Sequence, residues 1–181
     1  FRQYIEFIDD KSKLLELKVL DKLNELGLEY FIYEHPPLRT VEESKALRGE
    51  MHGGHTKNLF LRDKKKKNYL ITVNENQKID LKFLESELSS GRLSFGSPER
   101  LSQFLGVKPG AVSPLALLND KHNDVSFFID HNLLSENILN FHPLVNHLTV
   151  SIKVTDFKYF LKSQNKFYNE IYFWFFLNIF N

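Results

Sequence analysis

The chain has 181 residues, 42% hydrophobic and 26% charged, a balance typical of one globular domain with a sizeable core. A formal net charge of +1 excludes a strongly basic nucleic-acid protein, so any RNA contact depends on local clusters of charge. The absence of cysteine excludes disulfides, thiolate catalysis and cysteine-based zinc sites, and we expect a cytoplasmic protein. The chain begins at Phe1 and not at methionine, so a domain of a longer protein stays an open alternative.

Helical and strand patterns are interspersed along the chain. Helices are expected over 12–26, from a capping box at 40–43 to near Gly49, over 80–88 with a stop at Gly91, over 98–105 behind the N-cap Ser97, and from the cap Thr155 to Leu161. Strands are expected over 29–34, 58–62, 69–73, 92–95, 125–130, 138–141 and 149–153. The hairpin of 58–62 with 69–73 among these elements predicts an α+β fold, with a mixed, largely antiparallel sheet and flanking helices.

The C-terminal part of the chain differs from the rest in composition. The run Ile171–Leu177 is very apolar but shorter than the ~20 residues that span a bilayer. We therefore expect a domain boundary near 163, with 1–163 as the domain and 164–181 as a hydrophobic tail of unknown role. A packed terminal helix or strand, or a partner-binding tail, is favoured over a membrane segment.

The first candidate site residues are Lys57 and Asn58, which follow the pair Gly53–Gly54 at the mouth of a predicted strand. A lysine held where a flexible loop meets a rigid strand is well placed to contact a ligand. From this motif alone, a solvated lysine that starts a strand is the commoner case.

A second candidate is the turn-rich segment Leu105–Pro114. Gly106 stands where a helix should stop, and Pro109–Gly110 suits a turn with a positive φ at the glycine. Such a loop turns backbone N–H groups outward, where they can hold a carbonyl or an oxyanion. A connector without a ligand is the alternative.

The third candidate is the segment Phe141–Asn146. His142 precedes a proline, which biases its backbone to an extended conformation, and Asn146 offers a donor and an acceptor on one side chain. A lone histidine is more often structural than catalytic. The three segments could meet in one pocket, but their spacing does not prove it.

Taken in order, these motifs resemble a known family. They are His35-Pro-Pro, Thr40-Val-Glu-Glu43, His55-Thr-Lys-Asn-Leu-Phe-Leu61, Leu93-Ser-Phe95, Leu105-Gly-Val107, Pro109-Gly110, Ser113-Pro114 and Phe141-His-Pro-Leu-Val-Asn146. The chain resembles, from about residue 14 to about 161, the YbaK/ProX aminoacyl-tRNA deacylases, which are related to the editing domain of bacterial prolyl-tRNA synthetase. The last motif is similar to the ProX branch, which clears alanine wrongly attached to proline tRNA.

The resemblance implies an ester hydrolase that acts on mischarged aminoacyl-tRNA, most specifically alanyl-tRNA(Pro). Lys57 matches the essential lysine of the family and is expected to anchor the terminal adenosine or to stabilise transition-state charge. Asn58 is expected to orient the substrate, and His142 to position the α-amino group. Gly110 is expected to donate its N–H to the aminoacyl carbonyl, since Pro109 has no N–H.

The resemblance also implies the remaining contacts and partners. His55, Gly106, Pro109, Ser113 and Asn146 are expected to bind substrate, in a pocket that admits alanine and refuses proline. The expected partners are the acceptor end of proline tRNA and prolyl-tRNA synthetase; no membrane, cofactor or metal is expected. For the lysine run 64–67 (Lys64, Lys65, Lys66, Lys67), contact with tRNA phosphates competes with a solvated turn, which is favoured.

Several alternatives stay open. The substrate could instead be cysteinyl- or seryl-tRNA. The chain could be a non-catalytic tRNA-binding module appended to a synthetase, or a structural domain whose apolar tail docks a partner. The intact Lys57, Pro109–Gly110 and His142 argue against an inactive enzyme.

Overall fold

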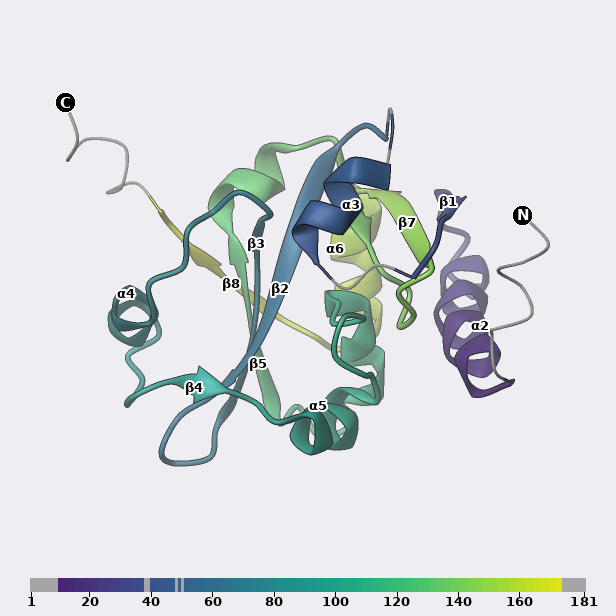
Figure 1. The fold of residues 1–181 in the computed structure, drawn as a ribbon. Helices are drawn as coiled ribbons and strands as arrows, with labels where there is room; N and C mark the ends of the chain where they lie inside the picture. The colour runs from purple at the N-terminus through teal and green to yellow at the C-terminus, as the bar shows by residue number, and fades with distance from the viewer. Residues whose placement is uncertain (1–9, 38–39, 48, 50, 174–181) are drawn as a thin grey trace, which may run out of the picture.

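The computed structural model describes residues 10–37, 40–47, 49 and 51–173. Within them a mixed sheet crosses the molecule with helices on both of its faces (Figure 1). The strands follow the order β1-β7-β6-β2-β3-β5-β8, and β4 pairs with β2 beside this path. Antiparallel pairs join β1 to β7, β7 to β6, and β2 to β3 and β4, whereas β2/β6, β3/β5 and β5/β8 are parallel. This arrangement confirms the expected α+β fold.

The strands are β1 (Tyr30–Glu34), β2 (Gly54–Arg62), β3 (Asn68–Asn74), β4 (Ser94–Phe95), β5 (Val125–Asp130), β6 (Ile138–Phe141), β7 (Leu148–Lys153) and β8 (Tyr168–Ile171). The α-helices are α2 (Asp10–Glu25), α3 (Val41–Leu47), α4 (Leu81–Glu87), α5 (Pro98–Leu105) and α6 (Val154–Ser163). Two 3₁₀ helices, η1 (Pro114–Asn119) and η2 (His131–Ser135), complete the elements of the described residues. Each of these helices is too short or too polar to cross a bilayer.

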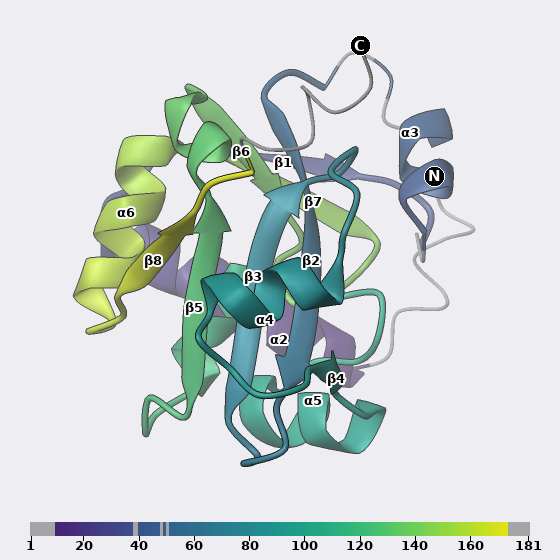
Figure 2. The ribbon, with the colours of Figure 1, turned by 90° about the vertical axis from the view of Figure 1, so that its left-hand side faces the viewer.

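The sheet separates two hydrophobic cores. The larger core packs residues of α2, α5, η1 and α6 against one face, and the smaller core packs Leu84 of α4 against the other. Figure 2 shows α4 in front of β2 and β3, with α2 behind them. Because neighbouring residues of a strand point to opposite faces, β2 divides its side chains between the two cores: Phe60 belongs to the larger and Leu61 to the smaller.

Local signals place most of the helix ends. Ser97 accepts a hydrogen bond from Arg100 N–H at 3.2 Å and so caps α5, and Gly106 ends that helix in the left-handed conformation. The expected cap at Thr155 is wrong, because α6 already begins at Val154, immediately after β7, and has no side-chain cap. The helix expected over 80–88 is confirmed as α4, with N-cap Asp80 and C-cap Leu88, but Gly91, which was expected to close it, lies three residues beyond the cap.

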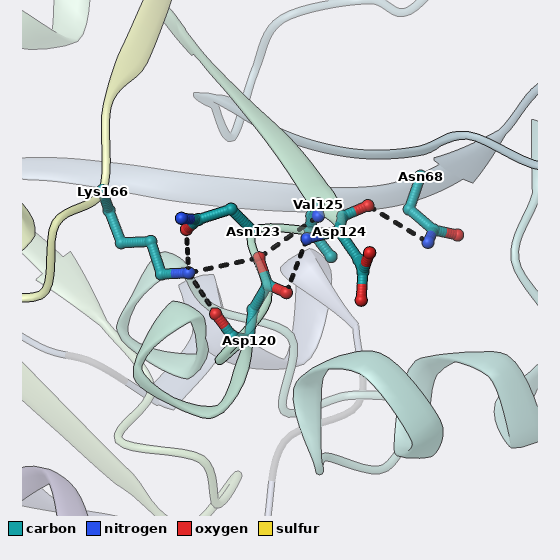
Figure 3. A network of polar contacts seen from close by, with 6 residues as sticks. All are labelled: Asn68, Asp120, Asn123, Asp124, Val125 and Lys166. Carbon is teal, nitrogen blue, oxygen red and sulfur yellow. Dashed lines mark hydrogen bonds and ion pairs between the residues drawn. The ribbon is translucent and has the colours of Figure 1, made fainter.

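A buried ion pair fixes the turn between η1 and β5 (Figure 3). The ammonium of Lys166, which precedes β8, lies 3.3 Å from Asp120 Oδ2 and 2.5 Å from Asn123 Oδ1, and it also donates to the Asp120 carbonyl. The Asp120 carboxylate accepts the N–H groups of Asp124 and Val125 at 2.9 and 3.2 Å. The side chains of Lys166 and Asp120 are only 8% and 2% exposed, so each charge depends on the other. This contact holds the start of β8 against the start of β5.

Candidate functional site

A small pocket lies where β2 separates from β6. The two strands pair only at Gly54 with Leu139 and at His55 with Asn140, after which β2 continues along β3. The pocket, with a cavity volume of about 50 Å³, has walls from β2, β6 and β7 and from the segment that follows β1. Its walls include His35, His55, Asn58, Glu75, His142 and Thr149.

The approach of β2 to β6 requires the glycine pair before the pocket. Gly53 has a φ of +99°, and a Cβ there would lie 2.8 Å from the carbonyl oxygen of Ile138. A Cβ on Gly54 would lie 2.9 Å from Leu139 Cδ2. Any side chain at Gly53 would therefore push the start of β2 away from β6.

The amide of Asn140, which is 4% exposed, ties the glycine loop to β6. Its Nδ2 donates to the carbonyls of His52 and Gly54, at 2.9 and 3.3 Å, and its Oδ1 accepts from the Ser151 hydroxyl. The Asn140 carbonyl accepts from Thr56 Oγ1 at 3.0 Å. One buried side chain thus sets the position of the loop from which β2 starts.

The amide of Asn58 is oriented by two threonines. Its Oδ1 accepts from Thr72 Oγ1 at 2.6 Å, and its Nδ2 lies 3.4 Å from Thr56 Oγ1. Because Thr72 belongs to β3 and Thr56 to β2, the amide is held on the sheet framework and presents a fixed edge to the pocket. This is the arrangement that a substrate-orienting group needs.

His142 is held as a neutral ring with one tautomer. Its Nδ1 lies 2.7 Å from the carbonyl of Leu148, so we assign the proton to Nδ1 and leave Nε2 as an acceptor. Burial lowers the pKa of His142, and the charges of His35 and His147 lower it further, against the opposing effect of the Leu148 carbonyl. The ring is therefore uncharged near neutral pH.

His35 forms a second fixed ring beside it. Its Nδ1 lies 2.9 Å from the Pro36 carbonyl, its Nε2 lies 2.9 Å from Thr149 Oγ1, and its ring centroid is 5.9 Å from that of His142. Burial also lowers the pKa of His35. Two of the pocket walls are thus neutral imidazoles.

Lys57 extends from β2 on the side away from Asn58. Its ammonium donates to the carbonyl of Gln77 at 2.6 Å, and in the described part of the chain it does not line the small pocket. Burial lowers the pKa of Lys57, while the charges of Glu42 and Glu75 raise it and that of Lys45 lowers it. The neighbouring His55 does line the pocket, with its Nε2 2.9 Å from the carbonyl of Met51.

A second, larger cleft holds three of the other expected residues. Gly106, Pro109 and Asn146 line a cleft of about 640 Å³ whose walls also include Lys11 and Lys108. The cleft adjoins the small pocket. His35 lines the pocket, His147 lines the cleft, and the N–H of His35 donates to the carbonyl of His147 at 3.0 Å. The expected substrate residues therefore divide between two neighbouring hollows.

The remaining expected residues lie outside both hollows. Gly110 has a φ of +89° in a turn closed by the Ala111 N–H on the Lys108 carbonyl at 3.1 Å. Ser113 is fully buried and caps η1 by accepting the Leu115 N–H at 3.2 Å. Among the described residues, neither lines the pocket or the cleft.

The lysine run 64–67 lies at the far end of β2. Lys64 is six positions after Asn58, which is about 20 Å along a strand. All four lysines are exposed, and the tip of the hairpin is held by Arg100, which donates to the Lys66 carbonyl at 2.6 Å. Any contact of this run with RNA is therefore distant from the pocket.

Sequence reasoning missed Glu75, Asn140 and Thr149, and it gave no site role to His35. Asn140 is a buried amide within an apolar strand, and that contrast is a visible signal. Glu75 follows the end of β3 and carries no signal of its own, because its place in the pocket depends on where β2 and β6 separate. In the described residues no group of three or more histidine, aspartate or glutamate side chains could hold a metal ion.

Comparison with known proteins identifies the family. Residues 35–160 match the family model described as the aminoacyl-tRNA editing domain. The prolyl-tRNA editing protein ProX of Acetoanaerobium sticklandii is 38% identical over 154 residues, covering 84% of this chain and 94% of that protein. The prolyl-tRNA synthetase associated domain-containing protein 1 of Mus musculus is 36% identical over 154 residues, covering 82% and 90%.

Solved structures agree in fold. The crystal structure of a candidate trans-editing enzyme for prolyl-tRNA synthetase superimposes with a TM-score of 0.64 at 19% identity, covering 90% of this chain and 97% of that one. At this identity the likeness supports the fold alone. The family model and the two close relatives confirm the resemblance of the motifs, and the chain therefore belongs to the aminoacyl-tRNA editing domain family, the YbaK/ProX deacylases, and is an aminoacyl-tRNA deacylase.

Proposed function

We propose that this deacylase clears alanine from mischarged proline tRNA. Hydrolysis of mischarged aminoacyl-tRNA follows from the family; the choice of alanine and of proline tRNA is our proposal. The name of the ProX relative and the motif Phe141–Asn146 support it. The observation that carries it is the size of the pocket at the separation of β2 and β6.

The volume of about 50 Å³ suits a very small side chain. On the same scale one water needs roughly 10–15 Å³, so the pocket accommodates a few small groups. A methyl side chain with its α-amino group suits this space better than the larger pyrrolidine ring of proline. A methylene or two changes affinity by only ~1–3 kcal/mol, so steric exclusion by fixed walls must supply the rest of the discrimination. The hydrogen-bonded rings of His35 and His142 are such walls.

The chemistry needs an attacking water and stabilisation of the oxyanion that forms at the ester carbon. In the proposed complex the Nε2 of His142 accepts a hydrogen bond from the α-amino group, and the fixed amide of Asn58 orients the ester. The ammonium of Lys57, now on the Gln77 carbonyl, turns toward the terminal ribose and phosphate and stabilises negative charge. The ribose hydroxyl beside the ester places the water. The N–H of Gly110 lies in the turn next to Pro109, which lines the larger cleft, and in this proposal it binds the carbonyl where the ester passes from the cleft to the small pocket.

The larger cleft suits the 3′ end of the tRNA. Its volume of about 640 Å³ lies within the ~300–1,000 Å³ usual for ligand pockets. Lys11 and Lys108 offer positive charge to phosphates, and Leu15 and Pro37 offer apolar surface to a base. The lysine run 64–67 would then meet phosphates further along the acceptor stem. A prolyl-tRNA synthetase remains the proposed protein partner, in keeping with the name of the mouse relative.

A deacylation assay on proline tRNA charged with alanine, proline, cysteine or serine tests the proposal. The expected result is fastest release of alanine, with prolyl-tRNA left largely intact. Equal rates on the alanyl and prolyl esters would reject selection by pocket size. Faster release of cysteine or serine would assign the pocket to that amino acid instead.

A further inference from the structure

Thr72 places a buried hydroxyl against Asn58, which lines the small pocket. The two residues face each other across the pairing of β2 with β3, and the side chain of Thr72 is fully buried. Its Oγ1 donates to Asn58 Oδ1 at 2.6 Å. A threonine within a strand needs no such contact, because β-branched side chains suit strands in general. The sequence alone therefore gives Thr72 no role in the site.

The hydrogen bonds around Asn58 run in one direction. A backbone carbonyl can only accept, so the Thr56 hydroxyl gives its single proton to the Asn140 carbonyl, 3.0 Å away. Thr56 Oγ1 then acts toward Asn58 as an acceptor, and the group that faces it at 3.4 Å has to be the NH₂ end of the amide. The amide oxygen is therefore turned to Thr72, which is its donor among the described residues.

The opposite orientation of this amide is disfavoured at both ends. It would set the amide oxygen against Thr56 Oγ1, whose proton is already committed to the Asn140 carbonyl. It would also set the NH₂ group against Thr72, whose own proton would lose the acceptor that it has in the described part of the chain. A buried donor without a partner is costly. The hydroxyl of Thr72 thus selects which end of the Asn58 amide lies where.

We propose that Thr72 is a positioning residue for deacylation: its hydroxyl holds the Asn58 oxygen, so that the amide presents an N–H and not a C=O to the substrate. Nδ2 carries two protons and gives one to Thr56, which leaves one for the pocket that Asn58 lines. An N–H that is fixed in advance binds an ester oxygen more strongly as negative charge develops there. The inference rests on the proposed function in one respect, the contact of Asn58 with the aminoacyl ester.

The first experiment measures steady-state deacylation, with kcat and KM separated, for the wild type, Thr72→Val and Thr72→Ser. Valine has nearly the shape of threonine without the hydroxyl, and serine keeps the hydroxyl. Thr72→Val should lower kcat about 10- to 100-fold with KM changed by less than about threefold, because an amide that can turn is often misplaced for the reaction. Thr72→Ser should restore most of the lost kcat, because it keeps the donor.

Tyr69→Phe is the matched control for stability. It removes another hydroxyl from β3, one that donates to Asp63 Oδ2 at 3.2 Å on the opposite face of the sheet. Its melting temperature should fall by a few degrees, much as that of Thr72→Val, since each variant loses one hydrogen bond. The kcat of Tyr69→Phe should stay at the wild-type value, because this hydroxyl does not contact Asn58.

A double-mutant cycle separates positioning from a structural role. If Thr72 acts through the amide alone, Thr72→Val should have no further effect once Asn58 is replaced by alanine, so the double variant should match Asn58→Ala within about twofold. Asn58→Asp tests which atom matters: its carboxylate only accepts, so this variant should be as slow as Asn58→Ala.

Each outcome decides the question. A wild-type kcat for Thr72→Val, a melting temperature for it far below that of Tyr69→Phe, or additive losses in the double variant would overturn the inference and leave the role of Asn58 standing. High activity of Asn58→Asp would overturn it too, because the pocket would then need an acceptor. Wild-type rates for Asn58→Ala would reject the contact of Asn58 with the ester and the inference together. If another aminoacyl ester reacts faster than alanyl-tRNA, the variants are compared on that ester, and only the choice of alanine is rejected.

Discussion

Replacing Asn140 by leucine should destabilise the protein and slow deacylation together. Leucine keeps a similar volume but removes both donors and the acceptor of a buried amide. The carbonyls of His52 and Gly54 and the Ser151 hydroxyl then lose their partner. At roughly 1 kcal/mol for each lost hydrogen bond, the free energy of unfolding should fall by about 3 kcal/mol. For a domain of this size that is about 6–12 °C in melting temperature.

The assay pairs thermal melting with single-turnover deacylation. Activity should fall more than stability explains, because the freed glycine loop no longer sets the position of His55 and Asn58 in the pocket. Ser151→Ala is the control: it removes one of the three bonds and should cost about 1 kcal/mol. A melting temperature for Asn140→Leu at or above that of Ser151→Ala would refute the reasoning, because the amide would then contribute nothing beyond its contact with Ser151.

Two further predictions concern charge. Lys57→Ala should reduce deacylation by about 10²–10³-fold, the usual worth of one group that stabilises transition-state charge, with a melting temperature within a few degrees of wild type; near-normal turnover would show that Lys57 is dispensable. The second concerns pH. Because burial lowers the folded-state pKa of His142 below 6.5, the unfolded chain binds a proton first as the pH falls. Stability and activity should both be intact above pH 6.5 and decline below it, and melting and rate profiles over pH 5–8 should show a smaller decline for His142→Asn. An acid limb centred above pH 6.5 would contradict the sign of the shift.

Much of the fold can be predicted from the sequence, because short apolar runs and capping residues determine where many strands and helices begin and end. The strands over 125–130 and 138–141 have the predicted bounds, and α5 begins behind Ser97 and ends at Gly106 as expected. The missed 3₁₀ helices span only six and five residues, too few to show a helical periodicity. The error at Thr155 has a tertiary cause: α6 follows β7 without a linker, and the Val154 N–H donates to the Asn137 carbonyl.

The site is less predictable, since it depends on pairing between distant strands. Lys57 and Asn58 were predicted as one motif, yet adjacent residues of a strand point to opposite faces, and only Asn58 lines the pocket. Likewise Gly106, Pro109 and Asn146 were expected in one pocket with His142 but line the neighbouring cleft. The place of Glu75 in the pocket wall depends on where β2 leaves β6, and that point is not visible in any local pattern.

The parallel pairing of β8 with β5 has a consequence for how the chain folds as it is synthesised. β5 holds Phe127, Phe128 and Ile129, and β8 covers its outer side. Until residue 171 has been made, β5 is an open edge with unpaired backbone groups and apolar side chains, the kind of edge that invites aggregation. The ion pair of Lys166 with Asp120 forms only when this last segment has been made, so the edge of β5 stays open until the last described strand is complete.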